Sequence, residues 1–371
     1  MVQTVGCIGG YAQGGGHSPA SRNYGLGADQ ILEAQVILAN GAIVTANACQ
    51  NSEIFFAIRG GGGGTYGVAI STTVKAYPPS SVVAQTFSMA PFTDAEIPQF
   101  MEALAIIYGA YPDLNDAGYS GYGSWFVQFE VDVVGNSTTG YSHAIALFGQ
   151  TVTEAESIFA PVAAQLQKYN GTSLVFSTSY LSFPSYTAYY DTLSGGQVAV
   201  GGSGGAASSR LFDRRALTSS PENLKKMLNV TAGTPGEFTL TSVSLVGGGA
   251  VFTDASDPNS GVLPAWRVSY VHNVVSRSWP AGANASTQAA FHHDLTYVKG
   301  AAMRALAPNT GSYMNEADRE DPRYLQDFYG QNVPKLEAIK AEYDPQSVFY
   351  CPTCLGSEKW AETSTGQLCP A

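Results

Sequence analysis

The chain is short of charge, and the charge it has is mainly negative. Only 13% of its 371 residues are charged, and 18 lysines and arginines against 29 acidic residues give a net charge of −11. Nucleic acids and anionic membranes both select basic surfaces, so neither is expected as a partner. No apolar run reaches the roughly 18 residues that a membrane span requires. With 44% hydrophobic residues, the chain is apolar enough for two folded domains and is not a disordered polymer.

A secretory leader is missing from the first 20 residues, which lack a basic start, an apolar core and a cleavage site. Four Asn-x-Ser/Thr sequons and a low lysine content still favour passage through a secretory pathway. The sequons begin at Asn136, Asn170, Asn229 and Asn284. We therefore expect a secreted glycoprotein whose leader is not part of this sequence.

Cysteine is scarce, and three of the five, Cys351, Cys354 and Cys369, fall near the end of the chain. A zinc site would need a fourth ligand close by, and the nearest histidine is His293. We therefore predict no metal site here or elsewhere. Instead we expect a disulfide from Cys369 to Cys351 or Cys354, which would hold the tail in an oxidising compartment.

Glycine, by contrast, is abundant and clustered near the start. The segment from Thr4 to His17 is rich in glycine, and Tyr24 to Asp29 continues the pattern. Glycines set among apolar residues let main-chain N–H groups approach a ligand, commonly a phosphate-bearing cofactor. The segment is not a Walker loop, because no Gly-Lys-Ser/Thr follows. Nor is it a Rossmann fingerprint, because no Gly-x-Gly-x-x-Gly opens a helix after a strand.

Three further blocks follow in the chain. Phe55 to Arg59 runs into Gly60 to Gly64 and then Thr65 to Val68; Tyr313 to Asp318 contains a Tyr-x-Asn motif; and Phe328 to Phe349 ends in Tyr-Asp-Pro and Val-Phe. With the first segment, these blocks resemble in order the motifs of the berberine-bridge-enzyme-like oxidases. This group is a branch of the vanillyl-alcohol-oxidase family, and the resemblance is to the form common among secreted fungal members.

The resemblance implies an α+β fold in three parts. Residues 1–79 would be the carboxy-terminal part of a PCMH-type FAD-binding domain. Residues 80–305 would form a substrate domain of antiparallel sheet backed by helices. Residues 306–371 would be the berberine-bridge-like segment that returns to the FAD domain, so the two ends of the chain should pack together.

The resemblance also implies FAD as cofactor, and oxidation of an alcohol, sugar or secondary metabolite with oxygen as the acceptor. Tyr313 is the predicted catalytic base, since relatives place this tyrosine over the reactive face of the flavin. A phenol needs a positive neighbour or the flavin itself to bring its pKa near neutrality. Asn315 is predicted to hydrogen-bond the cofactor. The other predicted FAD contacts are Thr4, Val5, Gly6, Gly9, Gly10, Tyr11, Gly14, Gly15, Gly16, Gly25, Gly67 and Val68.

Two departures from the family pattern concern the cofactor. Bicovalent relatives carry a cysteine two residues before the Thr-Val-Gly, where this chain has Val2, so no thioether forms there. A family member would also carry a long amino-terminal half of its flavin domain before Thr4. We therefore expect an amino-terminally truncated protein that by itself holds FAD weakly or not at all.

Local patterns predict the elements around these motifs. Ile54–Ile58 and Val68–Val74 look like strands around a tight glycine turn, and Asn40-Gly41 predicts a type I′ hairpin turn. Thr93 or Asp94 caps a helix, and Thr153 with Glu156 forms a capping box. Further expected elements are strands at residues 125–133, 239–246 and 266–276, a loop at 195–209, and helices from Ser220-Pro221, over 286–306, and over 322–341 with Asp321 as cap.

Several alternatives stay open. The chain could be a flavin-free remnant that only binds a ligand or partner, or a glycoside hydrolase using Glu316 and Asp318 as paired carboxylates. His17 is expected to be a packing or hydrogen-bonding residue. Arg267 either faces the active site or is a structural arginine, and the tyrosines at 186, 189 and 190 either line a site or belong to the core.

Overall fold

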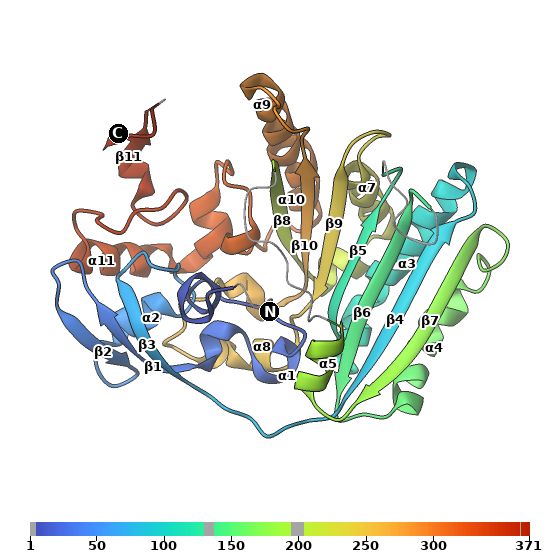
Figure 1. Cartoon of the computed structure of the whole chain (residues 1–371), viewed down its shortest axis with the longest axis horizontal. Helices are drawn as coiled ribbons and strands as arrows, with labels where there is room; N and C mark the ends of the chain where they lie inside the picture. Colours follow the sequence, from blue (N-terminus) through green and yellow to red (C-terminus); the bar gives the residue numbers. More distant parts are fainter. Residues whose placement is uncertain (1–4, 130–136, 194–203, 364) are drawn as a thin grey trace.

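Two antiparallel sheets with their helices make up this α+β protein (Figure 1). The computed structural model describes residues 5–129, 137–193, 204–363 and 365–371. A three-stranded sheet of order β2-β1-β3 lies within residues 31–74, and a seven-stranded sheet of order β7-β4-β6-β5-β9-β10-β8 lies within residues 82–278. The predicted boundaries at 79 and 305 stay predictions.

Every strand pair of the large sheet is antiparallel, as expected for the substrate part. Its strands are β4 (Val82–Pro91), β5 (Ser120–Phe126), β6 (Gly140–Phe148), β7 (Leu174–Phe183), β8 (Gly205–Asp213), β9 (Thr239–Leu245) and β10 (Ser269–Ser278). The small sheet is built from β1 (Ile31–Ile37), β2 (Ile43–Asn47) and β3 (Val68–Val74), and β11 (Trp360–Glu362) pairs with β12 (Leu368–Pro370). The expected loop at 195–209 is therefore wrong from Gly205 onward.

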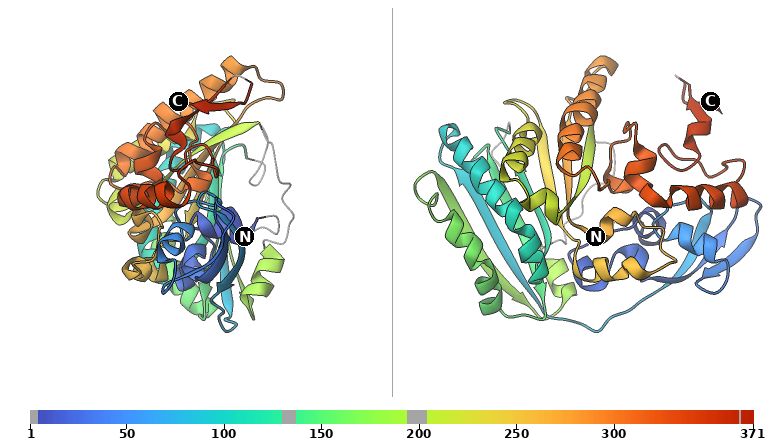
Figure 2. Two further views of the ribbon diagram at one scale, coloured as in Figure 1. Left: turned by 90° about the vertical axis from the view of Figure 1, so that its left-hand side faces the viewer. Right: turned by 180° about the vertical axis from the view of Figure 1, so that it is seen from behind.

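Helices α3 (Ile97–Asp116), α4 (Val152–Leu166) and α7 (Pro221–Ala232) cover one face of the large sheet (Figure 2). Large side chains from both layers, including Phe100, Tyr108 and Trp125, fill the core between them. The other helices are α1 (Ser21–Tyr24), α2 (Ser52–Ile58), α5 (Tyr186–Leu193), α6 (Arg214–Thr218), α8 (Gly249–Thr253), α9 (Ala285–His293), α10 (Gly300–Leu306) and α11 (Val333–Tyr343). No helix among the described residues is long and apolar enough to cross a membrane.

Helix starts follow local capping chemistry. The Thr93 side chain accepts a hydrogen bond from the Ala95 N–H before α3, as predicted. The capping box of α4 is Thr151 with Glu154, not Thr153 with Glu156, because the helix has already begun at Val152. Ser220 caps α7 as expected.

Three local predictions in the small sheet and the tail need correction. The run 54–58 is helix α2 and not a strand, because all five residues are buried and a short apolar run has no diagnostic period. The β1–β2 hairpin forms, but of its two predicted turn residues only Gly41 has a positive φ, so the turn is not type I′. The expected helix over 322–341 is interrupted at Gly330, whose φ is 56°, and α11 starts only at Val333.

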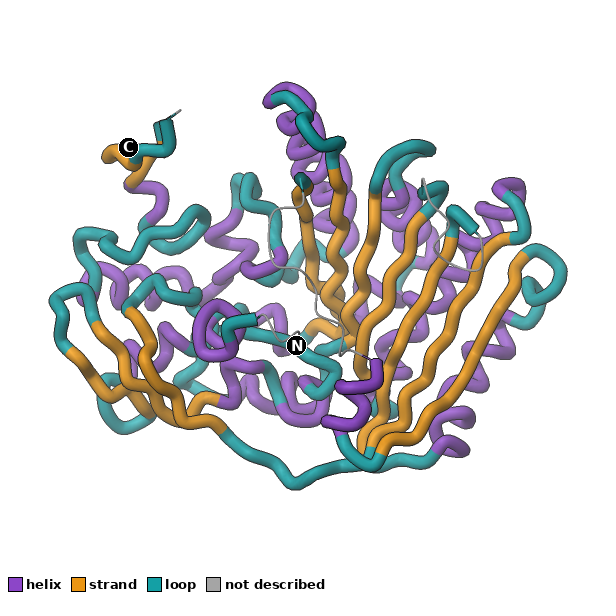
Figure 3. Tube along the Cα trace, viewed as in Figure 1, coloured by secondary structure: helices purple, strands orange, loops and turns teal. Residues whose placement is uncertain are grey.

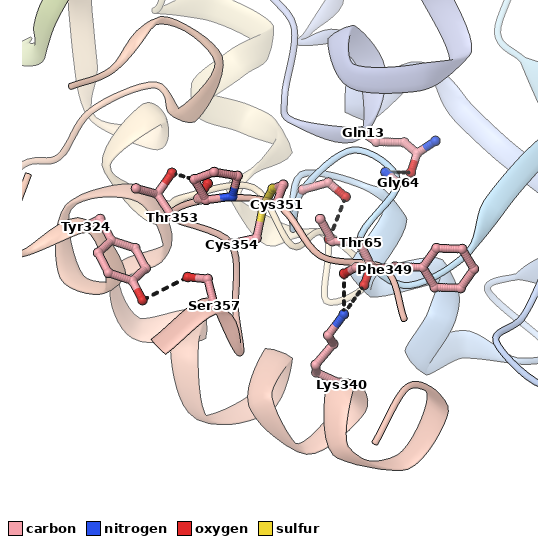
Figure 4. Close-up of a disulfide and its surroundings, with 12 residues drawn as sticks. Gln13, Gly64, Thr65, Tyr324, Lys340, Phe349, Cys351, Thr353, Cys354 and Ser357 are labelled. Carbon is pink, nitrogen blue, oxygen red and sulfur yellow. Dashed lines mark hydrogen bonds between the residues drawn. A yellow bond between two sulfur atoms is a disulfide. The ribbon is translucent and has the colours of Figure 1, made fainter. Parts of the chain in front are cut away.

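The two ends of the chain pack together, as expected. Phe55, Phe56, Phe328 and Leu336 share one buried cluster. The buried Lys340 ammonium of α11 donates hydrogen bonds to the Thr65 and Phe349 carbonyls, at 2.6 and 2.8 Å, and to Asp344 (Figure 4). This lysine ties the carboxy-terminal segment to the glycine-rich turn.

The tail disulfide joins Cys351 to Cys354 (Figure 4). Cys369 is a free, exposed thiol, so its predicted pairing is wrong. The β11–β12 ladder sets Cys369 opposite Ala361, while Cys351 and Cys354 are already close enough to bond each other.

Candidate functional site

The amino-terminal segment lies between the two sheets, against the end of the large one (Figures 1 and 3). On the face of the large sheet opposite the helices, Tyr122 of β5, Ser244 of β9 and His272 of β10 lie side by side in one row of the ladder. Because side chains alternate along a strand, a one-residue slip of β10 would bury His272 under the helices. The sheet register therefore places this histidine at the site.

The Tyr-x-Asn segment is held by the edge strand β8. The Leu211 N–H donates to the Gly311 carbonyl at 2.8 Å, and the Ser312 hydroxyl donates to the Ser209 carbonyl at 2.6 Å. Beneath it, the buried Arg210 guanidinium pairs with Asp327 at 2.9 Å. These contacts fix Tyr313 and the residues after it against the sheet.

Asn315 connects the two predicted motifs. Its side-chain amide donates one hydrogen bond to the Gly10 carbonyl at 2.8 Å and another to the Tyr313 hydroxyl at 2.7 Å. The amide thus orients the phenol of Tyr313 and the glycine-rich turn together.

Next to Tyr313, two histidines face one carboxylate. His17 Nε2 lies 3.6 Å from Glu316 Oε1, and His272 Nδ1 lies 3.5 Å from Glu316 Oε2. Both imidazole rings contact the Tyr313 ring, with centroids 5.3 and 5.5 Å apart, and Trp266 packs against all three. The Glu316 side chain is 44% exposed, whereas the histidines are buried, so the carboxylate alone faces the open side.

Burial and neighbouring charge set the protonation of this cluster. Burial raises the pKa of Tyr313 to about 12, partly opposed by the hydrogen bond from Asn315. Burial lowers the pKa of His272 to about 3, so its imidazole is neutral at neutral pH. Burial opposes ionisation of Glu316, whereas His17, when it is protonated, lowers the pKa of this carboxyl below its usual value.

The first glycines that are predicted to contact FAD leave space beside their main chain. Around Gly6, Gly9 and Gly10, no atom lies within 4 Å of the position that a Cβ would occupy. A planar cofactor could approach the main chain there, which is the role that glycine serves in such segments. Tyr11 and Gly25 line an adjoining pocket of about 270 Å³ with Cys7 and Ile8. The residues present thus fit part of an FAD molecule.

Four further glycines that are predicted to contact FAD lie against side chains of the protein itself. A Cβ at Gly14 would meet Asn315, and one at Gly15 would meet the Tyr313 ring. A Cβ at Gly16 would meet the Tyr11 ring, and one at Gly67 would meet Val36 of β1. Val5 and Val68 are exposed. Thr4 lies outside the described residues. Their contact with FAD stays a prediction.

One open alternative is resolved as structural, and a second only in part. Arg267 makes a two-pronged pair with Asp29, at 2.8 Å for each bond, and also reaches Ser260, so it is a structural arginine. Tyr189 is buried in a small cluster with β4 and β6 residues, whereas Tyr186 and Tyr190 are only partly buried, so whether these two line the site stays open.

The sequence identifies this cluster only in part. His17 is a buried, hydrogen-bonding residue, as predicted, and Glu316 belongs to the Tyr-x-Asn segment, but nothing in the sequence marks His272. His17 and Glu316 flank recognised motifs and are potential ligands or bases, which was a usable signal. His272 sits in an ordinary strand pattern, and only the pairing of β10 with β9 reveals its position.

Comparisons with known proteins bear on the family of this chain. Residues 312–354 match the berberine and berberine like family, and residues 2–47 match the FAD binding domain family. The FAD-linked oxidoreductase hmp9 of Hypomyces subiculosus is 44% identical over 98% of this chain and 58% of that protein. The FAD-linked oxidoreductase patO of Aspergillus clavatus is 33% identical over 99% of this chain and 61% of that protein.

A solved structure is equally similar. The VAO-type flavoprotein MtVAO713 from Myceliophthora thermophila C1 superposes with a TM-score of 0.95 at 42% identity, over 99% of this chain and 64% of that one. A chitooligosaccharide oxidase, at 20% identity and a TM-score of 0.68, shares the fold. The chain spans less than two thirds of the length of hmp9, patO and MtVAO713. It belongs to the berberine-bridge-enzyme-like, VAO-type family of FAD-linked oxidoreductases.

Proposed function

We propose that this chain supplies the substrate side and part of the flavin side of an FAD-dependent oxidoreductase. The substrate would be an alcohol, a sugar or a secondary metabolite, and oxygen would be the electron acceptor. The observation that carries the proposal is the bridge from Asn315 to both Gly10 and Tyr313, which brings the glycine-rich segment and the Tyr-x-Asn motif to one point.

The main chain at Gly6, Gly9 and Gly10 would hold the cofactor, because a Cβ placed on any of them would meet no atom of the described residues within 4 Å, their chain neighbours apart. When bound, FAD accepts a hydride from the substrate and is reoxidised by oxygen. The Tyr11 ring packs next to this segment, against Gly16 and Gly27, so it stiffens the turn on which the cofactor would rest.

Tyr313 is the proposed proton acceptor. Its phenol is protonated at neutral pH, since burial raises its pKa and the negative Glu316 raises it further. To accept the proton of the substrate, the phenol must first lose its own proton, and a positive charge nearby favours that ionisation. The rings packed around it belong to His17, Trp266 and His272, and none carries a permanent charge.

The glycoside hydrolase alternative has less support. Asp318 is 6% exposed, and its oxygens accept hydrogen bonds from the Thr296 hydroxyl, at 2.6 Å, and from the Glu320 N–H. A buried carboxylate occupied in this way is a poor partner for Glu316 in bond cleavage.

Flavin binding by the chain itself is the first test. We expect FAD fluorescence to change saturably as the protein is added, and the Gly10→Ala variant to bind at least 10-fold more weakly, because its methyl group would occupy the open side of the turn. The matched control is Gly109→Ala in α3, where only the Leu217 carbonyl lies within 4 Å of the new Cβ. Failure of the wild-type chain to bind FAD would favour the flavin-free ligand-binding alternative. Where FAD binds, oxygen uptake with alcohols and sugars then tests the reaction.

A further inference from the structure

The residues His17, His272 and Glu316 form a cluster that the oxidation chemistry leaves unused. We infer that they bind a divalent transition-metal ion, with zinc as the reference case. This departs from the expectation of no metal site, and it does not depend on whether the chain binds flavin.

The spacing of the ligand atoms suits a metal. The two histidine-to-glutamate distances are 3.6 and 3.5 Å, and the three ligand atoms all lie within 4.8 Å of one another. Ligands bound to zinc at about 2.0–2.2 Å stand roughly 3.3–3.5 Å apart in a tetrahedron. The two distances involve different oxygens of Glu316, so binding one ion would require the three side chains to move closer together from separations of up to 4.8 Å.

The histidine nitrogens that face Glu316 lack other partners. Across the described residues, His17 Nε2 and both ring nitrogens of His272 are buried without a hydrogen bond. The His17 side chain is 7% exposed and that of His272 is fully buried. Buried polar atoms normally have a partner, and an unplaced ion is one recognised reason for an exception.

The hydrogen-bond network leaves His17 Nε2 facing Glu316. The Tyr122 hydroxyl lies 3.3 Å from the His17 carbonyl and 3.1 Å from His17 Nδ1. In the tautomer with the ring proton on Nδ1, the Tyr122 oxygen accepts that proton and Nε2 keeps a lone pair toward the carboxylate. A cation between Nε2 and the carboxylate would bind both. An outer hydrogen bond of this kind is the usual way to orient a metal-bound histidine.

The chemical types of the three ligands and the solvent exposure of Glu316 indicate which metal ion would fit. Two imidazoles and one carboxylate suit zinc, iron(II) or copper better than calcium or magnesium, which prefer oxygen alone. Glu316 faces the open side, which leaves room for water or a substrate oxygen as a further ligand. Such an ion would also supply the positive charge that Tyr313 needs as a base, a consequence that rests on the proposed function.

Metal content is the direct test. The purified chain, without a histidine tag, is equilibrated with zinc at micromolar concentration, passed over a desalting column and measured by inductively coupled plasma mass spectrometry. We expect about one zinc ion per chain. Cobalt(II) in its place should give the visible absorption of a four- or five-coordinate site, and zinc should abolish that absorption.

The key variant is Glu316→Gln, which keeps the shape of an exposed side chain and should weaken zinc binding at least 10-fold. Glu320→Gln is the matched control, since Glu320 lies 3.5 Å from His292 in a comparable pair, and it should bind zinc like the wild type. His272→Gln should also lose the metal, with folding checked by circular dichroism. A wild-type chain with less than a tenth of an equivalent of zinc and no cobalt spectrum would overturn the inference, as would equal losses in Glu316→Gln and Glu320→Gln. Either result would mean that protons alone join the histidines to Glu316.

Discussion

The side-chain amide of Asn315 donates a hydrogen bond to the main-chain carbonyl of Gly10, 305 positions earlier in the chain. The same amide donates to Tyr313, so one side chain connects the amino-terminal glycine segment with the proposed catalytic phenol. The two most specific sequence motifs of this protein are therefore parts of one structure, and each of the predictions below tests a contact in or around it.

Replacement of Asn315 should affect the cofactor more than the fold. In Asn315→Ala, the Gly10 turn and the Tyr313 hydroxyl both lose their donor, so we expect FAD affinity, measured by fluorescence titration, to fall. Stability should drop by only about 1 kcal/mol, because the residue is exposed and water can replace its hydrogen bonds. Asn40→Ala removes another exposed asparagine, whose side chain accepts a bond from Ala42 in the β1–β2 hairpin, and should leave FAD affinity unchanged. A similar loss of FAD affinity in both variants would argue against the bridge.

Replacement of Tyr313 should affect chemistry more than binding. In flavin-loaded protein, Tyr313→Phe should slow flavin reduction by about 10²- to 10⁴-fold, the usual effect of removing a positioned base. Because the wild-type pKa is raised to about 12, the wild-type rate should rise with pH above neutrality, whereas the variant rate should not. Anaerobic stopped-flow spectroscopy measures both.

The control for Tyr313→Phe is Tyr329→Phe, which removes a buried hydroxyl that donates to the Thr353 carbonyl far from the site. Flavin bound to Tyr329→Phe should be reduced by substrate at the wild-type rate. If Tyr313→Phe also reduces at that rate throughout the pH range, Tyr313 is not the base.

The buried pair beneath the Tyr-x-Asn segment should be important for stability. In Asp327→Asn, the buried Arg210 guanidinium loses its counter-charge, and we expect a loss of about 3–5 kcal/mol in the free energy of unfolding. Asp113→Asn breaks an exposed pair with Arg214 and should cost less than about 1 kcal/mol. Urea denaturation of both variants gives the comparison, and equal costs would show that the buried pair has no special role.

Lowering the pH should destabilise the folded protein, because His143 is protonated more readily in the unfolded chain. Burial lowers the pKa of this imidazole from 6.5 to about 3, so the unfolded chain binds its proton more readily than the folded chain. The resulting stability is complete above pH 6.5 and is lost as the pH falls toward 3. From pH 6.5 to pH 5 the loss from this one group is about 2 kcal/mol.

Urea denaturation at pH 7 and pH 5 tests this titration. His143→Leu removes the titrating group and leaves the Tyr141 hydroxyl its partner Tyr111, so its stability should depend less on pH than that of the wild type. His293→Gln, at an exposed position, should behave like the wild type. An unchanged pH dependence in His143→Leu would assign the acid sensitivity to other groups.

Much of the fold and the cofactor class followed from the sequence because they depend on local chemistry and on ordered motifs. Capping at Thr93 and Ser220 uses side chains within three residues of the groups they bind, and the glycine-rich and Tyr-x-Asn motifs are contiguous. Where local signals were ambiguous, prediction failed. The buried run 54–58 has no period that separates helix from strand, and the cysteine spacing does not say which thiols meet.

The sequence by itself determined the α+β class, the family and the residues of the two motifs. Only the tertiary structure decided that His17, His272 and Glu316 share one point, because their meeting depends on the register of β9 and β10 and on the anchoring of residues 311–312 to β8. His17 lies more than 200 positions before His272 and Glu316 in the chain, and no local pattern encodes which strands pair or in which register. The physical reason is that pairing is selected by the burial of a whole face of the sheet at once, a property of the folded chain and not of any one segment.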